Sequence, residues 1–307
     1  MINLRSNKFI TIFLILFLLM GCSTARKVHH DTYSPNVDEK SWRVRLINPK
    51  NNRNVVFKKS IKVAVLDSGI NNGHRALKDK VAKTYNAINP DEKNNDNFNH
   101  GTAVAGIITG NSKSNNVGIA PNVVLYDVKV LDENGKSNVE TVIDGINWSI
   151  KQNVDLINIS FGFEINHRQL EEAIQRALNS NVIIVASSGN NLGLRVDYPA
   201  KYKGVISVAA LKPNLKRSSI SGKGKIDYAA PGVMILSTDN DYKYSEFNGT
   251  SFATAFVTGS IANLLGKAKR KITNSSFGVK KSVQTHIKSG FTIKNKSKKY
   301  KKHPILW

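Results

Sequence analysis

Three short segments contain the residue types that nucleophilic hydrolysis requires. Asp67 lies in V-L-D-S-G, His100 opens H-G-T-A-V-A-G, and Ser251 lies in G-T-S-F-A-T. A serine hydroxyl becomes an effective nucleophile when a base takes its proton, and an acid must hold that base in the correct tautomer. These three side chains could therefore supply the acid, base and nucleophile for the cleavage of an acyl bond.

The surrounding pattern predicts the elements that position these residues. Apolar runs rich in β-branched residues are typical of strands that are buried on both faces, and alternation with amphipathic helices indicates a parallel sheet with helices on both faces. Asp67 would then end a buried strand, at the edge where sites collect in α/β sheets, and His100 and Ser251 would begin helices. The expected strands are 61–66, 123–130, 156–159, 182–186 and 205–210, and apolar stripes mark helices at 139–150 and 170–177.

In their order and types, the three segments resemble the motifs of the subtilisin-like serine proteases, the subtilase family. The resemblance covers about residues 42–290, and 42–48 is similar to the short lead-in strand of these enzymes. It implies a three-layer α/β fold of the subtilisin type with a mostly parallel central sheet. It also implies a serine endopeptidase whose catalytic triad is Asp67, His100 and Ser251.

The resemblance also suggests how substrate would bind. Asn190, which ends A-S-S-G-N, matches the oxyanion-hole asparagine of the family; an Asx turn at the strand end is the alternative. Ser160, Phe161 and Gly162 resemble the edge that pairs with the substrate backbone, and a segment from Gly135 would form the opposing edge. Such main-chain pairing favours extended peptides with little sequence preference.

Selectivity would come from the first substrate pocket. Asp197 precedes Tyr198-Pro199, at the position that lies at the base of this pocket in the family. A carboxylate there would pair with an arginine or lysine of the substrate, so we predict cleavage after basic residues. The loop 191–196 is shorter than usual, and an ordinary turn residue remains the alternative for Asp197.

Two departures from the family concern calcium and maturation. The His-Pro-Asp-Leu run of many relatives reads H-R-A-L at 74–77, and the loop 111–117 is short and basic. Calcium needs several oxygen ligands. We therefore expect the usual tight calcium site to be absent, no catalytic metal, and no cofactor for catalysis. The segment between Cys22 and Ile61 is also too short for a pro-domain of the usual kind.

The first 22 residues resemble a bacterial lipoprotein signal peptide. Arg5 and Lys8 precede an apolar run at 9–19 that is too short to cross a membrane, and L-M-G-C ends at Cys22, the only cysteine. We predict lipidation of Cys22, a polar tether at 23–41, and a location at the extracellular face of the bacterial membrane. An ordinary cleaved signal or an uncleaved anchor is the alternative.

The charge is strongly unbalanced, with 45 Lys and Arg against 22 Asp and Glu and a net charge of +23. This excess favours anionic partners, and it could supplement a single acyl chain, which gives only marginal membrane binding. No acidic residue follows Glu246, and 291–307 form a lysine-rich tail after the peptidase domain at 42–290. No basic module with interleaved aromatic residues is visible, so nucleic acid is not an expected partner.

Together these features predict a monomeric, lipid-anchored endopeptidase that acts on peptide or protein substrates. A first pocket that accepts basic residues, on a small anchored enzyme, suits the processing of one exported precursor, as in lantibiotic leader peptidases; a general cell-surface protease is the alternative. A non-catalytic peptide-binding lipoprotein would not need the triad. An esterase of the α/β-hydrolase type would carry G-x-S-x-G and the order Ser, Asp, His, and the sequence has neither.

Overall fold

A seven-stranded sheet, parallel throughout, forms the centre of the fold. The computed structural model describes residues 60–110 and 118–267. The strands lie in the order β2-β3-β1-β4-β5-β6-β7, and every neighbouring pair is parallel. Their bounds are β1 Lys62–Asp67, β2 Val81–Asn86, β3 Val124–Lys129, β4 Leu156–Ile159, β5 Ile183–Ser187, β6 Ile206–Leu211 and β7 Tyr228–Pro231.

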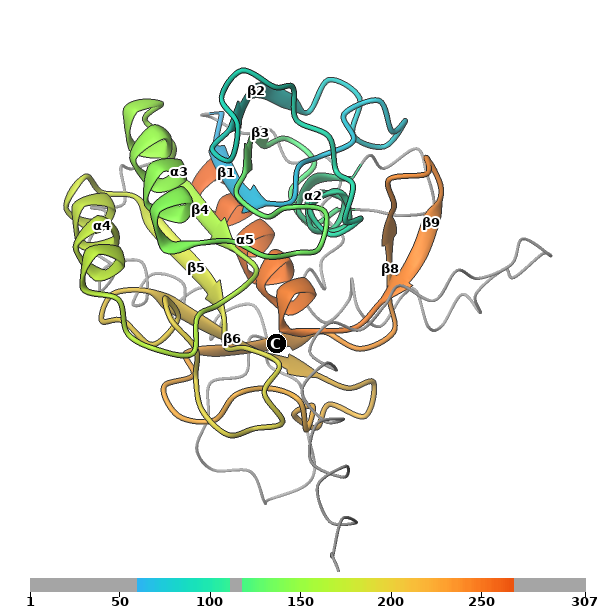
Figure 1. Ribbon diagram of the computed structural model, residues 1–307. Helices are drawn as coiled ribbons and strands as arrows, with labels where there is room; N and C mark the ends of the chain where they lie inside the picture. Colours follow the sequence, from blue (N-terminus) through green and yellow to red (C-terminus); the bar gives the residue numbers. More distant parts are fainter. Residues whose placement is uncertain (1–59, 111–117, 268–307) are drawn as a thin grey trace, which may run out of the picture.

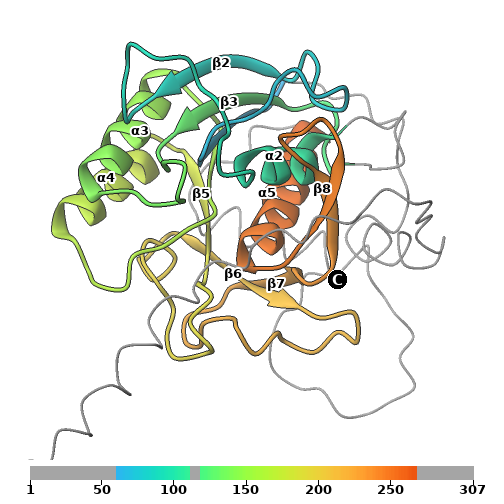
Figure 2. The ribbon, with the colours of Figure 1, turned by 45° about the vertical axis from the view of Figure 1, so that its right-hand side comes forward.

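Helices cover both faces of this sheet, as Figures 1 and 2 show. Helices α2 (Gly101–Thr109) and α5 (Thr250–Lys267) pack on one face, and α3 (Val139–Lys151) and α4 (Arg168–Asn179) pack on the other. Because side chains alternate along a strand, Val63 and Val65 of β1 enter the first core, whereas Ala64 and Leu66 enter the second. The predicted three-layer α/β fold is confirmed.

The predicted strands and amphipathic helices are present, with ends that differ by one or two residues. The sequence pattern missed β2, an edge strand whose Ala82, Lys83 and Thr84 are exposed and which therefore lacks a continuous apolar run. It also missed three strands of four residues, namely β7 and the two strands of an antiparallel hairpin, β8 (Ile235–Thr238) and β9 (Tyr244–Phe247).

Strand order brings distant segments together at one edge. Strands β1, β4 and β5 are neighbours, so their carboxyl ends place Asp67, Ser160 and Asn190 beside one another. Strand β1 also lies where the chain changes direction across the sheet, with β3 on one side and β4 on the other. Ligands bind at such switch points in open α/β sheets.

Several predictions fall on residues outside the described ranges. These are the signal peptide with Cys22, the tether at 23–41, the lead-in strand at 42–48, the loop 111–117 and the basic tail at 291–307. Among the helices in residues 60–110 and 118–267, none is long and apolar enough to cross a membrane.

Candidate active site

Asp67 and His100 form a directly hydrogen-bonded pair. Asp67 ends β1 and is fully buried, and its Oδ1 lies 2.7 Å from Nδ1 of His100. The same oxygen accepts the backbone N–H of Ser68 at 2.8 Å. A carboxylate can only accept, so Nδ1 of His100 carries the proton and Nε2 is left as the basic nitrogen.

Gly101 allows the histidine to approach the acid this closely. His100 is the N-cap of α2, and a Cβ on Gly101 would lie 2.2 Å from the carbonyl oxygen of Gly69 and 3.1 Å from Cβ of Asp67. No larger residue fits between the helix start and the end of β1. Close packing therefore explains why the H-G-T segment has a glycine at position 101.

The pKa of His100 is raised above its ordinary value. Burial of the ring by itself would lower that pKa, but the charge of Asp67, its hydrogen bond, and the charge of Asp96 together outweigh the burial. The imidazolium is therefore stabilised, as a general base requires once it has taken a proton.

Asp96 is a site residue that the sequence analysis missed. It is buried, its Oδ1 accepts the hydroxyl of Ser68 at 2.7 Å and the N–H of Asn99 at 2.9 Å, and its Oδ2 accepts the N–H of Thr102 at 2.8 Å. The Ser68 hydroxyl in turn accepts the N–H of Gly101 at 3.0 Å. This network fixes the first turn of α2 on the end of β1. The sequence signal that could have identified Asp96 is its position, four residues before the predicted helix start at His100.

Ser251 lies in the first turn of α5, next to His100. The rings of His100 and Phe252 are 5.4 Å apart, which places the start of α5 against the imidazole. The Ser251 hydroxyl, however, donates to the carbonyl oxygen of Ser160 at 2.6 Å. A Ser251 hydroxyl that reacts must first leave this hydrogen bond to reach His100, and catalytic hydrogen bonds often tighten only when substrate is bound.

Buried polar side chains connect α5 to β4 beneath the serine. Asn158 on β4 donates to the hydroxyl of Ser160 at 2.8 Å and accepts the hydroxyl of Thr258 at 2.7 Å. The Ser160 hydroxyl donates to the carbonyl of Ser251 at 3.2 Å. These bonds hold the nucleophile-bearing turn against the carboxyl end of β4.

The amide of Asn190 has a defined orientation. Its Oδ1 accepts both the backbone N–H and the hydroxyl of Thr250, each at 3.0 Å. Because a backbone N–H can only donate, the amide atom that faces it must be the oxygen, and Nδ2 is the donor that remains. This nitrogen and the backbone N–H groups of the first turn of α5 provide donors beside Ser251.

A cleft of about 620 Å³ connects these groups. Its wall includes Gly135, against which Phe98 packs so closely that a Cβ would lie 2.4 Å from the ring. The structure brings the predicted residues together here: His100, Ser251, Asn190, Ser160–Gly162, Gly135 and Asp197 all line the cleft, and Asp67 lies behind His100.

Asp197 also lines this cleft. It is 8% exposed, and a Cβ on Gly189 would lie 1.9 Å from its Oδ2, while one on Gly162 would lie 2.8 Å from its Cβ. Burial raises the pKa of Asp197; a hydrogen bond from Asn191 at 2.9 Å and the charge of Arg195 act in the opposite direction. Gly162 and Gly189 therefore leave room for the Asp197 side chain itself, which packs against both of them.

Asp127 is a further buried acid beside the site. It lies on β3, and its Oδ2 accepts the N–H of Ile70 at 3.3 Å, while its Oδ1 is buried without a hydrogen-bond partner among the described residues. Burial raises the pKa of Asp127 to about 7. Within residues 60–110 and 118–267, this site included, no group of three or more His, Cys, Asp or Glu could hold a metal ion.

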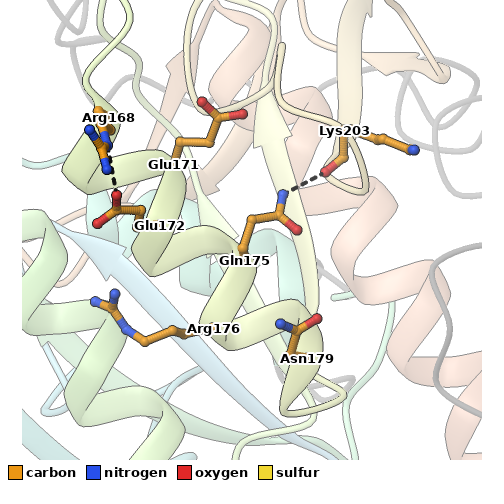
Figure 3. Close-up of a pocket in the computed structure, with 7 residues that line it drawn as sticks. All are labelled: Arg168, Glu171, Glu172, Gln175, Arg176, Asn179 and Lys203. Carbon is orange, nitrogen blue, oxygen red and sulfur yellow. Dashed lines mark hydrogen bonds and ion pairs between the residues drawn. The ribbon is translucent and has the colours of Figure 1, made fainter.

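A second hollow, of about 690 Å³, lies over α4. Figure 3 shows its charged and amide side chains, among them the ion pair of Arg168 with Glu172 at 2.9 Å and the bond from Gln175 to the carbonyl of Lys203 at 3.3 Å. Exposed pairs of this kind contribute little free energy. No serine or histidine lines this hollow, so the predicted Ser-His pair belongs to the first cleft.

Comparison with known proteins agrees with this geometry. A model of the subtilase family matches residues 58–299. The chain is 39% identical over 237 residues to a thermostable alkaline protease of Halalkalibacterium halodurans, covering 76% of this chain and 64% of the relative. It is 39% identical over 216 residues to subtilisin E of Bacillus subtilis, covering 68% and 56%. The chain thus spans less than two thirds of either relative.

A solved structure gives the same result for the fold. The crystal structure of a cold-adapted subtilisin-like serine proteinase superposes with a TM-score of 0.67 at 30% sequence identity. The superposition covers 73% of this chain and 81% of the other.

Proposed function

The chain belongs to the subtilase family, and on this premise we propose that it is a serine endopeptidase. The observation that carries the proposal is the 2.7 Å bond between buried Asp67 and His100 in a cleft that also contains Ser251 and Asn190. Hydrolysis of a peptide bond needs a nucleophile, a base and an oxyanion site, and these side chains supply all three.

The mechanism follows from the positions of the atoms. The Ser251 hydroxyl turns from the Ser160 carbonyl to Nε2 of His100, gives up its proton, and attacks the scissile carbonyl carbon. Nδ2 of Asn190 and the backbone N–H of Ser251 stabilise the negative oxygen of the tetrahedral intermediate. His100 then donates the proton to the leaving amine, and the C–N bond breaks. Water, deprotonated by His100, releases the acyl group and restores Ser251.

Substrate is proposed to bind as an extended strand. The segment Ser160–Gly162 and Gly135 line the same cleft as His100 and Ser251, and we place them on opposite sides of the bound peptide. A peptide that pairs its main chain with these walls would present one carbonyl to Ser251. Its preceding side chain would then point toward Asp197.

We further propose that this first pocket selects arginine or lysine. A largely buried carboxylate that lines the catalytic cleft would pair with a substrate cation and would be costly to leave unpaired. The test compares hydrolysis of matched peptides that end in arginine or leucine at the cleaved bond. Arginine should be strongly preferred, and Asp197→Ser should remove most of that preference. Equal rates in the parent enzyme would refute the pocket assignment.

The proposed setting is the extracellular face of the bacterial membrane, with Cys22 lipidated and the enzyme monomeric. Support comes from the L-M-G-C segment and the net charge of +23. Mass spectrometry of the N-terminal peptide should find a diacylglyceryl group on Cys22, and Cys22→Ser should release the enzyme into the medium. An unmodified cysteine on a membrane-bound chain would contradict this anchor.

The proposed substrate is an exported precursor, as for the lantibiotic leader peptidases; a general surface protease is the alternative. A strongly basic surface would attract acidic stretches of such a precursor. A cleavage profile from a mixed peptide library separates the two: one narrow motif supports processing, whereas broad cleavage supports the general protease. Genes for peptide modification and export beside this one would further support processing.

We also propose that the enzyme works without the usual tight calcium site, on the sequence of residues 74–77 and 111–117. Melting curves with calcium and with a chelator should coincide. An upward shift on calcium addition alone would show that a site is present.

A further inference from the structure

Three charged side chains meet at the proposed first pocket: Glu164 and Asp197, which line the cleft, and Arg195, which contacts both. The guanidinium of Arg195 forms an ion pair through Nη2 with Oε2 of Glu164, and its Nε lies 3.9 Å from Oδ1 of Asp197. Nε is buried and makes no hydrogen bond within the part of the chain that the structure describes. Arg195 thus forms a close ion pair with Glu164, whereas its separation from Asp197 is too long for a hydrogen bond.

The backbone imposes this arrangement. Phe163 and Tyr198 form an antiparallel bridge with N–H···O distances of 2.7 and 2.9 Å, which sets Glu164 opposite Asp197. The amide of Asn191 donates to the carbonyl of Arg195 and to Oδ1 of Asp197, both at 2.9 Å. Two acids therefore face each other with one arginine beside both.

The two contacts differ in their surroundings. The side chain of Glu164 is 75% exposed, that of Arg195 is 38% exposed, and that of Asp197 is 11% exposed. The Asn191 and Arg195 contacts both fall on Oδ1 of Asp197, whereas Oδ2 packs against Gly189, and both residues line the cleft. A substrate cation that reached Oδ2 would meet a carboxylate with a protein cation already nearby. Like charges at this distance repel.

We propose that Arg195 is a specificity-determining residue, an internal cation that competes with the basic side chain of the substrate for Asp197, and that Glu164 is a positioning residue that holds Arg195 away from Asp197. This inference rests on the proposed function, since it requires cleavage after basic residues. Glu164 thereby sets how much of the charge of Asp197 is available to substrate.

The test uses the ratio of kcat/KM for two peptides that differ only in arginine or leucine at the cleaved bond. Arg195→Met should raise this ratio about twofold to fivefold, and Glu164→Gln should lower it by a similar factor, as expected for partly exposed charge pairs. Both changes should appear in KM for the arginine peptide rather than in kcat, because the cation is held alike in the ground and transition states. Arg176→Met is the matched control. Arg176 is an exposed arginine on α4 that donates to Asn147 at 3.2 Å (Figure 3), so its loss removes the same charge away from the pocket and should leave the ratio unchanged.

The double variant distinguishes positioning from direct contact. If Glu164 acts through Arg195, Glu164→Gln should change the ratio less in the Arg195→Met background than in the parent. An equal effect in both backgrounds would overturn the positioning role, and a ratio that Arg195→Met leaves unchanged or lowers would overturn the role of Arg195. A parent enzyme that cleaves peptides without preference would refute the pocket assignment and this inference together. A parent that cleaves no peptide would refute the proposed function itself.

Discussion

Asn190 anchors Thr250 in this structure and is also the proposed oxyanion donor, and one substitution separates these two roles. Its Oδ1 binds the N–H and the hydroxyl of Thr250 at the start of α5, and its Nδ2 is the proposed oxyanion donor. Asn190→Asp keeps an acceptor for Thr250 and removes the donor. Asn190→Ala removes both, so the two variants form a matched pair.

The expected magnitudes follow from these contacts. Loss of the oxyanion donor should lower kcat about 10²- to 10³-fold, a figure taken from subtilisin itself, with little change in KM. Asn190→Asp should fold at least as stably as the parent, because a carboxylate at a helix N-terminus gains about 0.3–1 kcal/mol. Asn190→Ala strands the hydroxyl of Thr250, a residue that is 1% exposed, and should lose about 1–3 kcal/mol of stability.

Steady-state kinetics on one peptide and thermal melting measure the two effects separately. For a domain of this size, each kcal/mol shifts the melting temperature by about 2–4 °C. Asn190→Asp should thus be nearly inactive but fully folded, whereas Asn190→Ala should be inactive and less stable. An active Asn190→Asp enzyme would refute the oxyanion role. Equal melting temperatures for Asn190→Ala and the parent would refute the anchoring role.

Two further predictions concern pH. Because the pKa of His100 is raised, the ring stays protonated, and so cannot act as a base, up to a higher pH. Asp96→Asn removes one of the charges that raise this pKa, so the acid limb of the kcat/KM profile should move to lower pH. An acid limb that does not move would exclude an effect of Asp96 on His100. Burial raises the pKa of Asp127 to about 7, so the folded chain holds this proton more tightly than the unfolded chain does. The contribution of Asp127 to the free energy of unfolding should therefore fall by roughly 1.4 kcal/mol per pH unit from about pH 4 to about pH 7. Asp127→Asn should flatten this slope in urea unfolding measured across that range; a slope equal to that of the parent would contradict the assignment.

The central sheet could be predicted from sequence because its strands are buried on both faces. Leu156–Ile159, for example, is apolar apart from Asn158, and no exposed position interrupts the run. Strand β2 gives no such signal, since three of its residues face solvent at the sheet edge. An apolar run in the sequence therefore indicates that a strand is buried, and it does not indicate which strands pair with each other.

The candidate site shows the same division. Asp67, His100, Ser251 and Asn190 could be identified because short motifs surround them. Arg195 could not, because its contacts depend on the pairing of two loops, which sequence spacing does not reveal. The direction of the Ser251 hydroxyl is likewise a matter of rotamer, and no motif encodes it.

The central claim is that Ser251 cleaves peptides, and the most direct test compares Ser251→Ala with the parent on a mixed peptide library. The variant loses one hydrogen bond, to Ser160, so its melting temperature should stay within a few degrees of the parent. Its cleavage should fall to background, a loss of about 10⁶-fold in subtilisin itself. A folded Ser251→Ala protein that cleaves the library as the parent does would contradict the account.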